Sequence, residues 1–556
     1  MLRLNGKFKF ISFFFFFFFY SFFKSFVGLG LAGGGVGCSH WITSHQVMEA
    51  AAHSFYTRLP AKGKPRGGEY TCMSAIISEH PEGVFSVASL ATGTKCIGIG
   101  GQCARGYVVT DCHAEVLARR ALLRRLLEEV GDWYRAGGTG GLPAAPREHS
   151  LLEPLPGSAH LFQLRPGMRL HLYISDSPCG EAAEYSDAGG GGEGCSGAAA
   201  AAGGARRTGA KPVAGEGASA GAPPLPVLLP VLRTKSGRSD LPAHARTQSM
   251  CCSDKVARWV GLGLQSALLA QFLAQPLRLH SIVVSPGEGA CAAITASLAA
   301  STAHQEDALV RAVITRALHC HAAAGGVLGG LLDPPVLCKV SATQFSDGRA
   351  RKAAAAVAAS GAALQPPPEQ QLSGKKRPPP PEEGLPEGGG GAPSAAAPPP
   401  PCSHSIVAYT SASTGALVVE ALLGVSGRKM GSNPKSPPER VSSMVCKRRL
   451  GELFAQVRLL ALARAPGMRE ALQGEGAGEV AAPCSSPMGT YWQAKLGDAL
   501  GGGHLSGSLA VRHRLAKRAW HEAKPSMQRE ADFSTWLHCN HTEWEGFSLD
   551  CPPQPL

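Results

Sequence analysis

The stretch TDCHAE at residues 110–115 decides the fold, because it joins a short apolar run to a long segment with helical periodicity. Its His113 and Glu115 stand two residues apart at the start of that helix, after an Asp111 that suits the N-cap position. An imidazole and a carboxylate this close together can bind a metal ion and move a proton. Taken alone the pair is a weak signal, since a buried histidine beside an acid is more often structural.

Two later segments supply cysteines in matching positions. SDSPCG at residues 175–180 places Cys179 after a strand pattern, and MCCSDK at 250–255 places two cysteines at the head of the next helical pattern. Helix N-termini stabilise negative charge, so thiolates are favoured at both places. One imidazole and two thiolates leave the fourth position on zinc open to water, as in a catalytic site. The three segments together predict a zinc hydrolase of the kind that deaminates nucleobases.

The spacing does not decide which cysteine is the third zinc ligand. Zinc deaminases commonly use Pro-Cys-x-x-Cys, whereas Ala182 occupies the position of the second cysteine here. The candidates are Cys252, Cys251 and Cys195, of which Cys195 is the weakest because it lies in a Gly- and Ala-rich stretch. The missing cysteine also argues against a cytidine deaminase.

The coarse pattern alternates strands with helices, which is typical of a layered α/β domain. We expect strands at 84–90, 169–174 and 279–284, and helices at 112–134 and 252–273. The region from about residue 403 to 549 is richer in helix signals and is expected to complete the same domain.

The composition excludes several classes of protein. Lys+Arg 54 against Asp+Glu 41 gives a formal charge of +13, and Gly 69 with Pro 42 makes 111 of the 556 residues. The glycines have no three-residue period, which excludes collagen, and a single continuously apolar stretch excludes a multi-span membrane protein. The excess of cations indicates a polyanionic partner. Seventeen cysteines without regular spacing indicate a reducing compartment.

Three segments have a composition that does not suit a packed core. Residues 1–44 hold the phenylalanine-rich run Phe10–Phe23 behind a basic flank, which fits a targeting signal, a membrane anchor or low-complexity sequence from a misplaced start. Residues 188–226 and 353–401 are rich in Gly, Ala and Pro and are predicted to be disordered insertions. One domain is expected over 45–549, with its motifs between 90 and 549.

The motif segments, extended to LYISDSPCG at 172–180 and CSDKVARW at 252–259, resemble the adenosine-to-inosine RNA editing deaminases. LPAKGKP at 59–65 is similar to the tRNA-specific adenosine deaminase 1 branch of that family. The resemblance implies a three-layer α/β/α zinc deaminase core over the editase domain. Its implied zinc ligands are His113, Cys179 and Cys252, and its implied catalytic residue is Glu115, which moves the proton of the attacking water at C6 of a flipped-out adenine.

By the same resemblance the substrate is adenosine in tRNA, at position 37 beside the anticodon of an alanine tRNA. The enzyme would then be a hydrolase acting on a cyclic amidine C–N bond. An editor of double-stranded RNA or mRNA shares every motif and stays an alternative, as does a non-catalytic RNA-binding relative. We expect a nuclear or cytoplasmic protein without a stable protein partner. The Phe-rich segment leaves organellar or secretory targeting and membrane contact open.

Two helical patterns carry cations on their apolar stripes, which destabilises a fold unless each cation finds a partner. Arg119 lies on the stripe of the first helix and Arg258 on that of the second, whereas Arg124 and Arg125 are expected to point to solvent. Each stripe cation could pair with a carboxylate or extend to water. Because both helices show the same anomaly one turn past the proposed ligands, a shared buried polyanion is favoured.

The family resemblance identifies that polyanion as inositol hexakisphosphate, enclosed by a helical C-terminal half. The positions that match the family's binding residues are Arg119, Arg120, Lys255, Arg258, Trp259, Gln265, Lys447, Tyr491, Lys495, Lys517 and Trp536. His513 and His538 depart from the family pattern, in which a tyrosine and an acidic residue are usual. By analogy with a hydrogen-bond relay of the family, Asp111 either links the zinc site to this cluster through Lys255 or acts as a cap alone.

Overall fold

The chain divides into two units, Met1–Val47 and Met48–Leu556, and the domain described below belongs to the second. The computed structural model describes residues 37–137, 149–158, 160–184, 210–212, 233–235, 242, 246–247, 249–286, 295–318, 336–341, 343–362, 399–433, 435–464 and 513. The phenylalanine-rich run and most of segment 188–226 lie outside these residues. Across the described ranges, no helix has both the length and the apolarity needed to cross a membrane.

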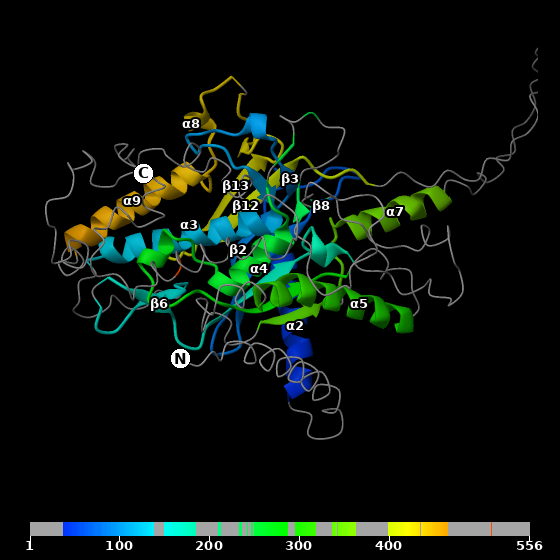
Figure 1. Ribbon diagram of the computed structural model, residues 1–556, viewed down its shortest axis with the longest axis horizontal. Coiled ribbons are helices and arrows are strands. Elements are labelled where there is room, and N and C mark those ends of the chain that lie inside the picture. The colour runs from blue at the N-terminus through cyan, green and yellow to red at the C-terminus, as the bar shows by residue number, and fades with distance from the viewer. Residues whose placement is uncertain are drawn as a thin grey trace, which may run out of the picture. The chain divides into compact units, whose positions relative to one another are not determined.

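An eight-stranded sheet forms the centre of the second unit (Figure 1). In spatial order its strands are β11 (Leu337–Val340), β10 (Leu279–Val284), β7 (Arg169–Ile174), β1 (Met73–Glu79), β2 (Phe85–Thr92), β12 (His404–Thr410), β13 (Leu417–Leu423) and β14 (Arg428–Lys429). The pairs β11–β10 and β10–β7 are parallel, and the other neighbours are antiparallel. Short two-stranded ladders are β3 (Thr94–Cys96) with β4 (Asp111–His113), β5 (Leu152–Pro154) with β6 (Phe162–Leu164), and β8 (Lys211–Pro212) with β9 (Arg233–Thr234).

Helices cover this sheet. In chain order they are α2 (Gly37–Arg58), α3 (Ala114–Arg135), α4 (Cys252–Leu262), α5 (Thr295–Val310), α7 (Arg349–Ala362), α8 (Pro438–Val441) and α9 (Lys447–Arg464). α5 continues as the π-helical turn η8 (Arg311–Thr315), and single 3-10 turns are η2 (Ile99–Gly101), η3 (Glu181–Ala183) and η6 (Leu269–Gln271). α3 lies along the sheet, with α9 packed beside it (Figure 1).

Alternate residues of the central strands enter two separate cores, because successive side chains of a strand point to opposite faces. Ile76 and Leu172 pack with α3, α4 and α9 in one core. Ile77 and Tyr173 pack with the part of α2 that begins at Met48 in the other core. The strands are therefore buried on both faces, and the predicted α/β class is confirmed as a central sheet with helices.

Several element predictions are confirmed, and one helix prediction is wrong. The strands predicted at 169–174 and 279–284 are β7 and β10, and the predicted first helix is α3. The helix predicted over 252–273 ends at Leu262, because Gly263 adopts a φ of +87°. A Cβ at Gly263 would lie 2.2 Å from Oε1 of Gln265, so both the backbone and the space require glycine here.

The segment 353–401, predicted as a disordered insertion, is partly structured. Its first ten residues belong to α7, since alanine has the highest helix propensity and this stretch is Ala-rich. At its other end Pro401 forms a bridge with Tyr70. The described residues after 403 form β12, β13 and β14 as well as α8 and α9, so this part of the C-terminal half is not purely helical.

Candidate functional site

The three predicted metal ligands converge from separate elements. His113 ends β4, Cys179 follows β7, and Cys252 is the first residue of α4. One ligand atom from each of these side chains lies within 4.8 Å of the others. The backbone N–H of Cys252 donates to Sγ of Cys179 over 3.3 Å, so the N-terminus of α4 stabilises negative charge on that sulfur.

The two sulfurs have opposite pKa shifts. The hydrogen bond from Cys252 outweighs burial and, with nearby Lys235 and His113, holds the pKa of Cys179 well below its usual range. Burial and the neighbouring Cys179 raise the pKa of Cys252. These shifts favour the proton on Cys252 over Cys179, and a divalent cation can replace that proton.

The competing Cys251 does not join this group. Cys251 is the N-cap of α4 and packs against Gly180, where a Cβ would lie 2.4 Å from its Sγ. Burial raises the pKa of Cys251. Cys195 lies outside the described residues. Among the described cysteines, Cys252 is the one that meets His113 and Cys179.

Glu115 is the second residue of α3 and is buried, with 3% of its surface exposed. Its negative charge contributes to raising the pKa of Cys252 and that of Cys72, which places the carboxylate close to the cysteine ligands. Glu115 does not belong to the group of side chains whose ligand atoms meet, so it is placed as a base beside that group rather than as a fourth ligand.

The sequence predicts Asp111 as the N-cap of α3, but His113 occupies that position. The Asp111 side chain turns instead to the imidazole, whose Nδ1 donates to Oδ1 of Asp111 over 2.9 Å. This hydrogen bond fixes the ring and leaves Nε2 for a metal. The thiol of Cys96 also donates to the same oxygen, over 3.0 Å.

Two lysines neutralise Asp111. Nζ of Lys235 lies 2.8 Å and 3.1 Å from the two carboxylate oxygens, and Lys255 forms a second ion pair with Oδ2. Burial alone would raise the pKa of Asp111, but Lys235, Lys255 and His113 hold it well below its usual range. The predicted contact between Asp111 and Lys255 is present. Lys235 was not predicted, because nothing in the local sequence distinguishes it from the neighbouring Arg233 and Arg238.

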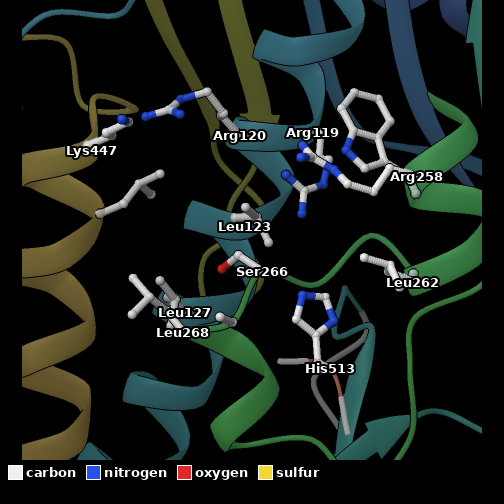
Figure 2. Close-up of a pocket in the computed structure, with 14 residues that line it drawn as sticks. Arg119, Arg120, Leu123, Leu127, Arg258, Leu262, Ser266, Leu268, Lys447 and His513 are labelled. Atoms are coloured by element: carbon white, nitrogen blue, oxygen red, sulfur yellow. The ribbon is translucent and has the colours of Figure 1, made fainter. Parts of the chain in front are cut away.

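A cavity lies between α3, α4 and the start of α9. Its volume is about 190 Å³. Four of its lining residues are cations, namely Arg119, Arg120, Arg258 and Lys447. Figure 2 shows the guanidinium groups of Arg119 and Arg258 directed toward one another and that of Arg120 extending toward Lys447. No acidic residue lines this cavity within the described part of the chain, so its charged lining is cationic.

The cavity also contains polar atoms that lack a partner. Nε of Arg119 donates to the carbonyl of Leu264 over 2.8 Å, and Nε of Arg120 donates to the carbonyl of Val445 over 2.6 Å. Nη2 of Arg120 and Nε1 of Trp259 are buried without a hydrogen-bond partner among the described residues. Buried donors of this kind are rare unless a ligand satisfies them. The donor set fits an anion with several phosphate groups.

Comparison with known proteins gives a family for this arrangement. Residues 89–355 match the family model of the adenosine-deaminase (editase) domain. The chain contains an adenosine-deaminase (editase) domain. The matched range includes the three proposed ligands His113, Cys179 and Cys252, and also Glu115 beside them.

Several curated proteins are similar to this editase chain. tRNA-specific adenosine deaminase 1 of Drosophila melanogaster is 28% identical over 241 residues, which cover 43% of this chain and 54% of that protein. The human protein of the same name is 26% identical over 346 residues, covering 44% and 66%. The double-stranded RNA-specific adenosine deaminase of Rattus norvegicus is 30% identical over 257 residues, covering 43% and 19%. The chain thus spans about half of the first relative's length and a fifth of the rat protein's.

The other residues predicted to bind the polyanion either do not line this cavity or lie outside the described residues. Gln265 is fully buried, donates to the carbonyl of Leu262 over 2.6 Å and contacts Nδ1 of His513 at 3.2 Å. Lys255 pairs with Asp111 rather than lining the cavity. Outside the described residues lie Tyr491, Lys495, Lys517, Trp536 and His538.

The prediction that Arg124 and Arg125 point to solvent is wrong. Arg125 is 4% exposed and donates to the carbonyls of Ala88 and His149, over 3.0 Å and 2.6 Å. Arg124 is half-buried and pairs with Glu128 at 2.9 Å. Backbone carbonyls outside the helix accept from Arg125, and helical periodicity cannot reveal such partners.

Proposed function

We propose that this chain catalyses the zinc-dependent hydrolytic deamination of adenosine to inosine in RNA, with a tRNA as its substrate. The observation that carries the proposal is the convergence of His113, Cys179 and Cys252 on one point, with buried Glu115 beside them. An imidazole, two thiols and a separate carboxylate are the set of groups that zinc deaminases use.

The ligand side chains fit zinc. The lowered pKa of Cys179 favours its thiolate, and a divalent cation would replace the proton of Cys252 and bind both sulfurs. The hydrogen bond from His113 to Asp111 leaves Nε2 as the metal-binding nitrogen. When bound, zinc supplies a Lewis acid that lowers the pKa of water held next to it.

The chain's own residues then handle the proton. Glu115 accepts a proton from the attacking water and donates it to the departing amine as ammonia leaves. Because Glu115 is buried, bulk water does not compete for that proton. Asp111 keeps the imidazole in one orientation, and Lys235 and Lys255 keep Asp111 charged.

Inositol hexakisphosphate is the second resident group that we assign to this domain. Arg119, Arg120, Arg258 and Lys447 would hold its phosphates, and the unpartnered Nε1 of Trp259 would donate to one of them. Bidentate guanidinium groups suit phosphate oxygens. Four cations and no acidic residue among the described lining residues support a polyanion here rather than a neutral ligand.

The choice of tRNA is supported by the two relatives named tRNA-specific adenosine deaminase 1. The position beside the anticodon, position 37 of an alanine tRNA, belongs to the same proposal. An editor of double-stranded RNA is the second candidate, because the rat double-stranded RNA-specific relative matches at 30% identity. A non-catalytic relative is disfavoured, since the three ligands and Glu115 come together.

The test is to incubate the purified full chain with an unmodified alanine tRNA and with a long RNA duplex, and to map inosine in both. The proposal expects inosine at the adenosine beside the anticodon and little in the duplex. Inosine in the duplex alone would select the second candidate. No inosine in either RNA, from protein shown to contain zinc, would contradict both.

A further inference from the structure

Two segments bring a concentration of cations to one face of the domain. Residues 94–110 and 424–449 together contain nine Lys and Arg and one Glu. The segments lie side by side, because the N–H of Val109 donates to the carbonyl of Gly427 over 3.1 Å and that of Arg448 to Gly106 over 3.0 Å. In Figure 1 they meet next to α8. Such an imbalance in charge is the footprint of a polyanion-binding surface.

Four of these nine cations, Arg105, Lys429, Lys435 and Arg440, are exposed. Lys447 and Arg448 are directed inward, since Lys447 lines the cavity and Arg448 is 5% exposed. The Arg105 side chain is 61% exposed. We call the four exposed residues, together with the half-buried Arg428 and Arg449, the basic face.

An aromatic ring holds part of the basic face in place. The guanidinium groups of Arg105 and Arg449 lie 5.5 Å and 6.0 Å from the ring centre of Tyr107. Arg449 also donates to Oγ of Ser442 over 3.1 Å and to the carbonyl of Glu439 over 3.0 Å. Guanidinium groups fixed on a ring lose little conformational entropy when they bind a phosphate.

Among the described residues, carboxylates pair with three members of the basic face. Glu439 pairs with Arg105, Glu452 with Arg449, and Glu420 with Lys429. Lys435 and Arg440 are exposed and have no ion pair within the described ranges.

The loop that carries Arg105 and Tyr107 connects the basic face to the metal group along the chain. It leaves β3 after Cys96 and returns as β4, which ends at His113. Cys96 pairs with Asp111 across this ladder. The same ladder therefore anchors one part of the basic face and carries one of the proposed metal ligands.

We infer that the basic face binds the phosphate backbone of the substrate RNA next to the target adenosine. This inference rests on the proposed function and names the surface that receives its substrate. Backbone contacts by Lys and Arg set the position of a nucleic acid without reading its sequence. The face would thus position RNA while the metal group supplies the chemistry.

The test compares two triple variants of the full chain with equal loss of charge. One is Lys429→Gln/Lys435→Gln/Arg440→Gln, which neutralises exposed members of the basic face. The control is Arg58→Gln/Lys339→Gln/Arg351→Gln, also at exposed sites. Lys339 on edge strand β11 matches Lys429 on the opposite edge strand β14, with 46% and 48% exposure and one glutamate partner each.

The dissociation constant for the tRNA is measured at several salt concentrations, with inosine formation at saturating RNA as a second readout. The basic-face variant should bind about 10-fold more weakly at 0.15 M salt, and the slope of log K against log salt should fall by about 2. Its turnover at saturating RNA should match the wild type. The control variant should change binding by less than about twofold.

Equal binding by the two triple variants would overturn the inference and would assign the basic face to another partner, such as an acidic protein. Weakened binding with an unchanged salt slope would also overturn it, because lost phosphate contacts must lower the slope. The proposed function can fail separately: wild-type protein that makes no inosine, but whose RNA binding depends on these three residues, would refute the deaminase and leave the surface standing.

Discussion

At the scale of single residues, Glu115 is buried beside the cysteine ligands but is not needed as a ligand itself. Glu115→Gln keeps the shape of the side chain and removes the base. We expect inosine formation to fall by about 10²–10⁴-fold, with zinc content and thermal stability unchanged. Glu82→Gln, at an exposed turn position, is the matched control and should retain full activity. Unaltered turnover of Glu115→Gln would remove this residue from the mechanism.

His113 and Cys179 could be proposed as ligands from the sequence, because one stands at the start of a helix and the other follows a strand, where local pattern is informative. Spacing did not separate Cys252 from Cys251, so the choice of Cys252 depended on the family resemblance. Lys235 could not be predicted, since its importance comes from Asp111, which is 124 positions earlier in the chain. The same limit made Asp111 look like a helix cap.

At the scale of elements, α3 carries a buried acid with an unusual titration. Burial, only partly offset by Arg125, raises the pKa of Glu129 to about 7. Oε1 of Glu129 accepts from the N–H of Leu152 over 2.7 Å, and Oε2 has no partner within the described ranges. The folded state thus favours the protonated acid, so its contribution to stability is complete below about pH 4.5 and is lost as pH rises toward 7.

The side chain of the Glu129→Gln variant stays neutral, so this variant should not lose stability in this way as pH rises. Between pH 5 and pH 8 we expect the wild type to lose, relative to the variant, on the order of 2–3 kcal/mol of unfolding free energy. Thermal or denaturant unfolding of both proteins at each pH checks this. Parallel pH curves for the two proteins would contradict the raised pKa.

Element boundaries show what periodicity can and cannot give. β7 and β10 appear at their predicted residues, because the alternation in RLHLYI and the apolar end of LHSIVV are both typical of buried strands. α4 stops eleven residues early at Gly263, although apolar spacing continues through Phe272. Periodicity describes which side chains can be buried together, whereas a positive φ at one glycine decides where the backbone turns.

At the scale of the whole molecule, the cavity brings together cations from α3, α4 and α9. Arg120→Gln/Lys447→Gln removes two of its four charges. Acid extracts of purified wild-type protein should contain about one inositol hexakisphosphate per chain, and extracts of the variant at least 10-fold less. The melting temperature should fall as well, because a ligand bound to the folded state stabilises it.

Lys352→Gln/Arg351→Gln, on α7, is the control for that extraction and should keep the ligand. Equal recovery from both variants would mean that the cavity does not hold the polyanion.

The sequence predicted the cation cluster from the apolar stripes of two helices, α3 and α4. The contribution of Lys447 from α9 was predicted by family resemblance alone. Strand order was equally beyond prediction, because β12 pairs with β2 across more than 300 residues of intervening chain.

The central claim is that one zinc ion is held by His113, Cys179 and Cys252, and two adjacent cysteines allow a direct test. Metal content is measured by mass spectrometry on the purified full chain and on its Cys251→Ser and Cys252→Ser variants. We predict one zinc per chain in the wild type and in Cys251→Ser, and none in Cys252→Ser, because only Cys252 lies within reach of the other two ligands among the described cysteines. Zinc retained by Cys252→Ser, or lost from Cys251→Ser, would contradict the account.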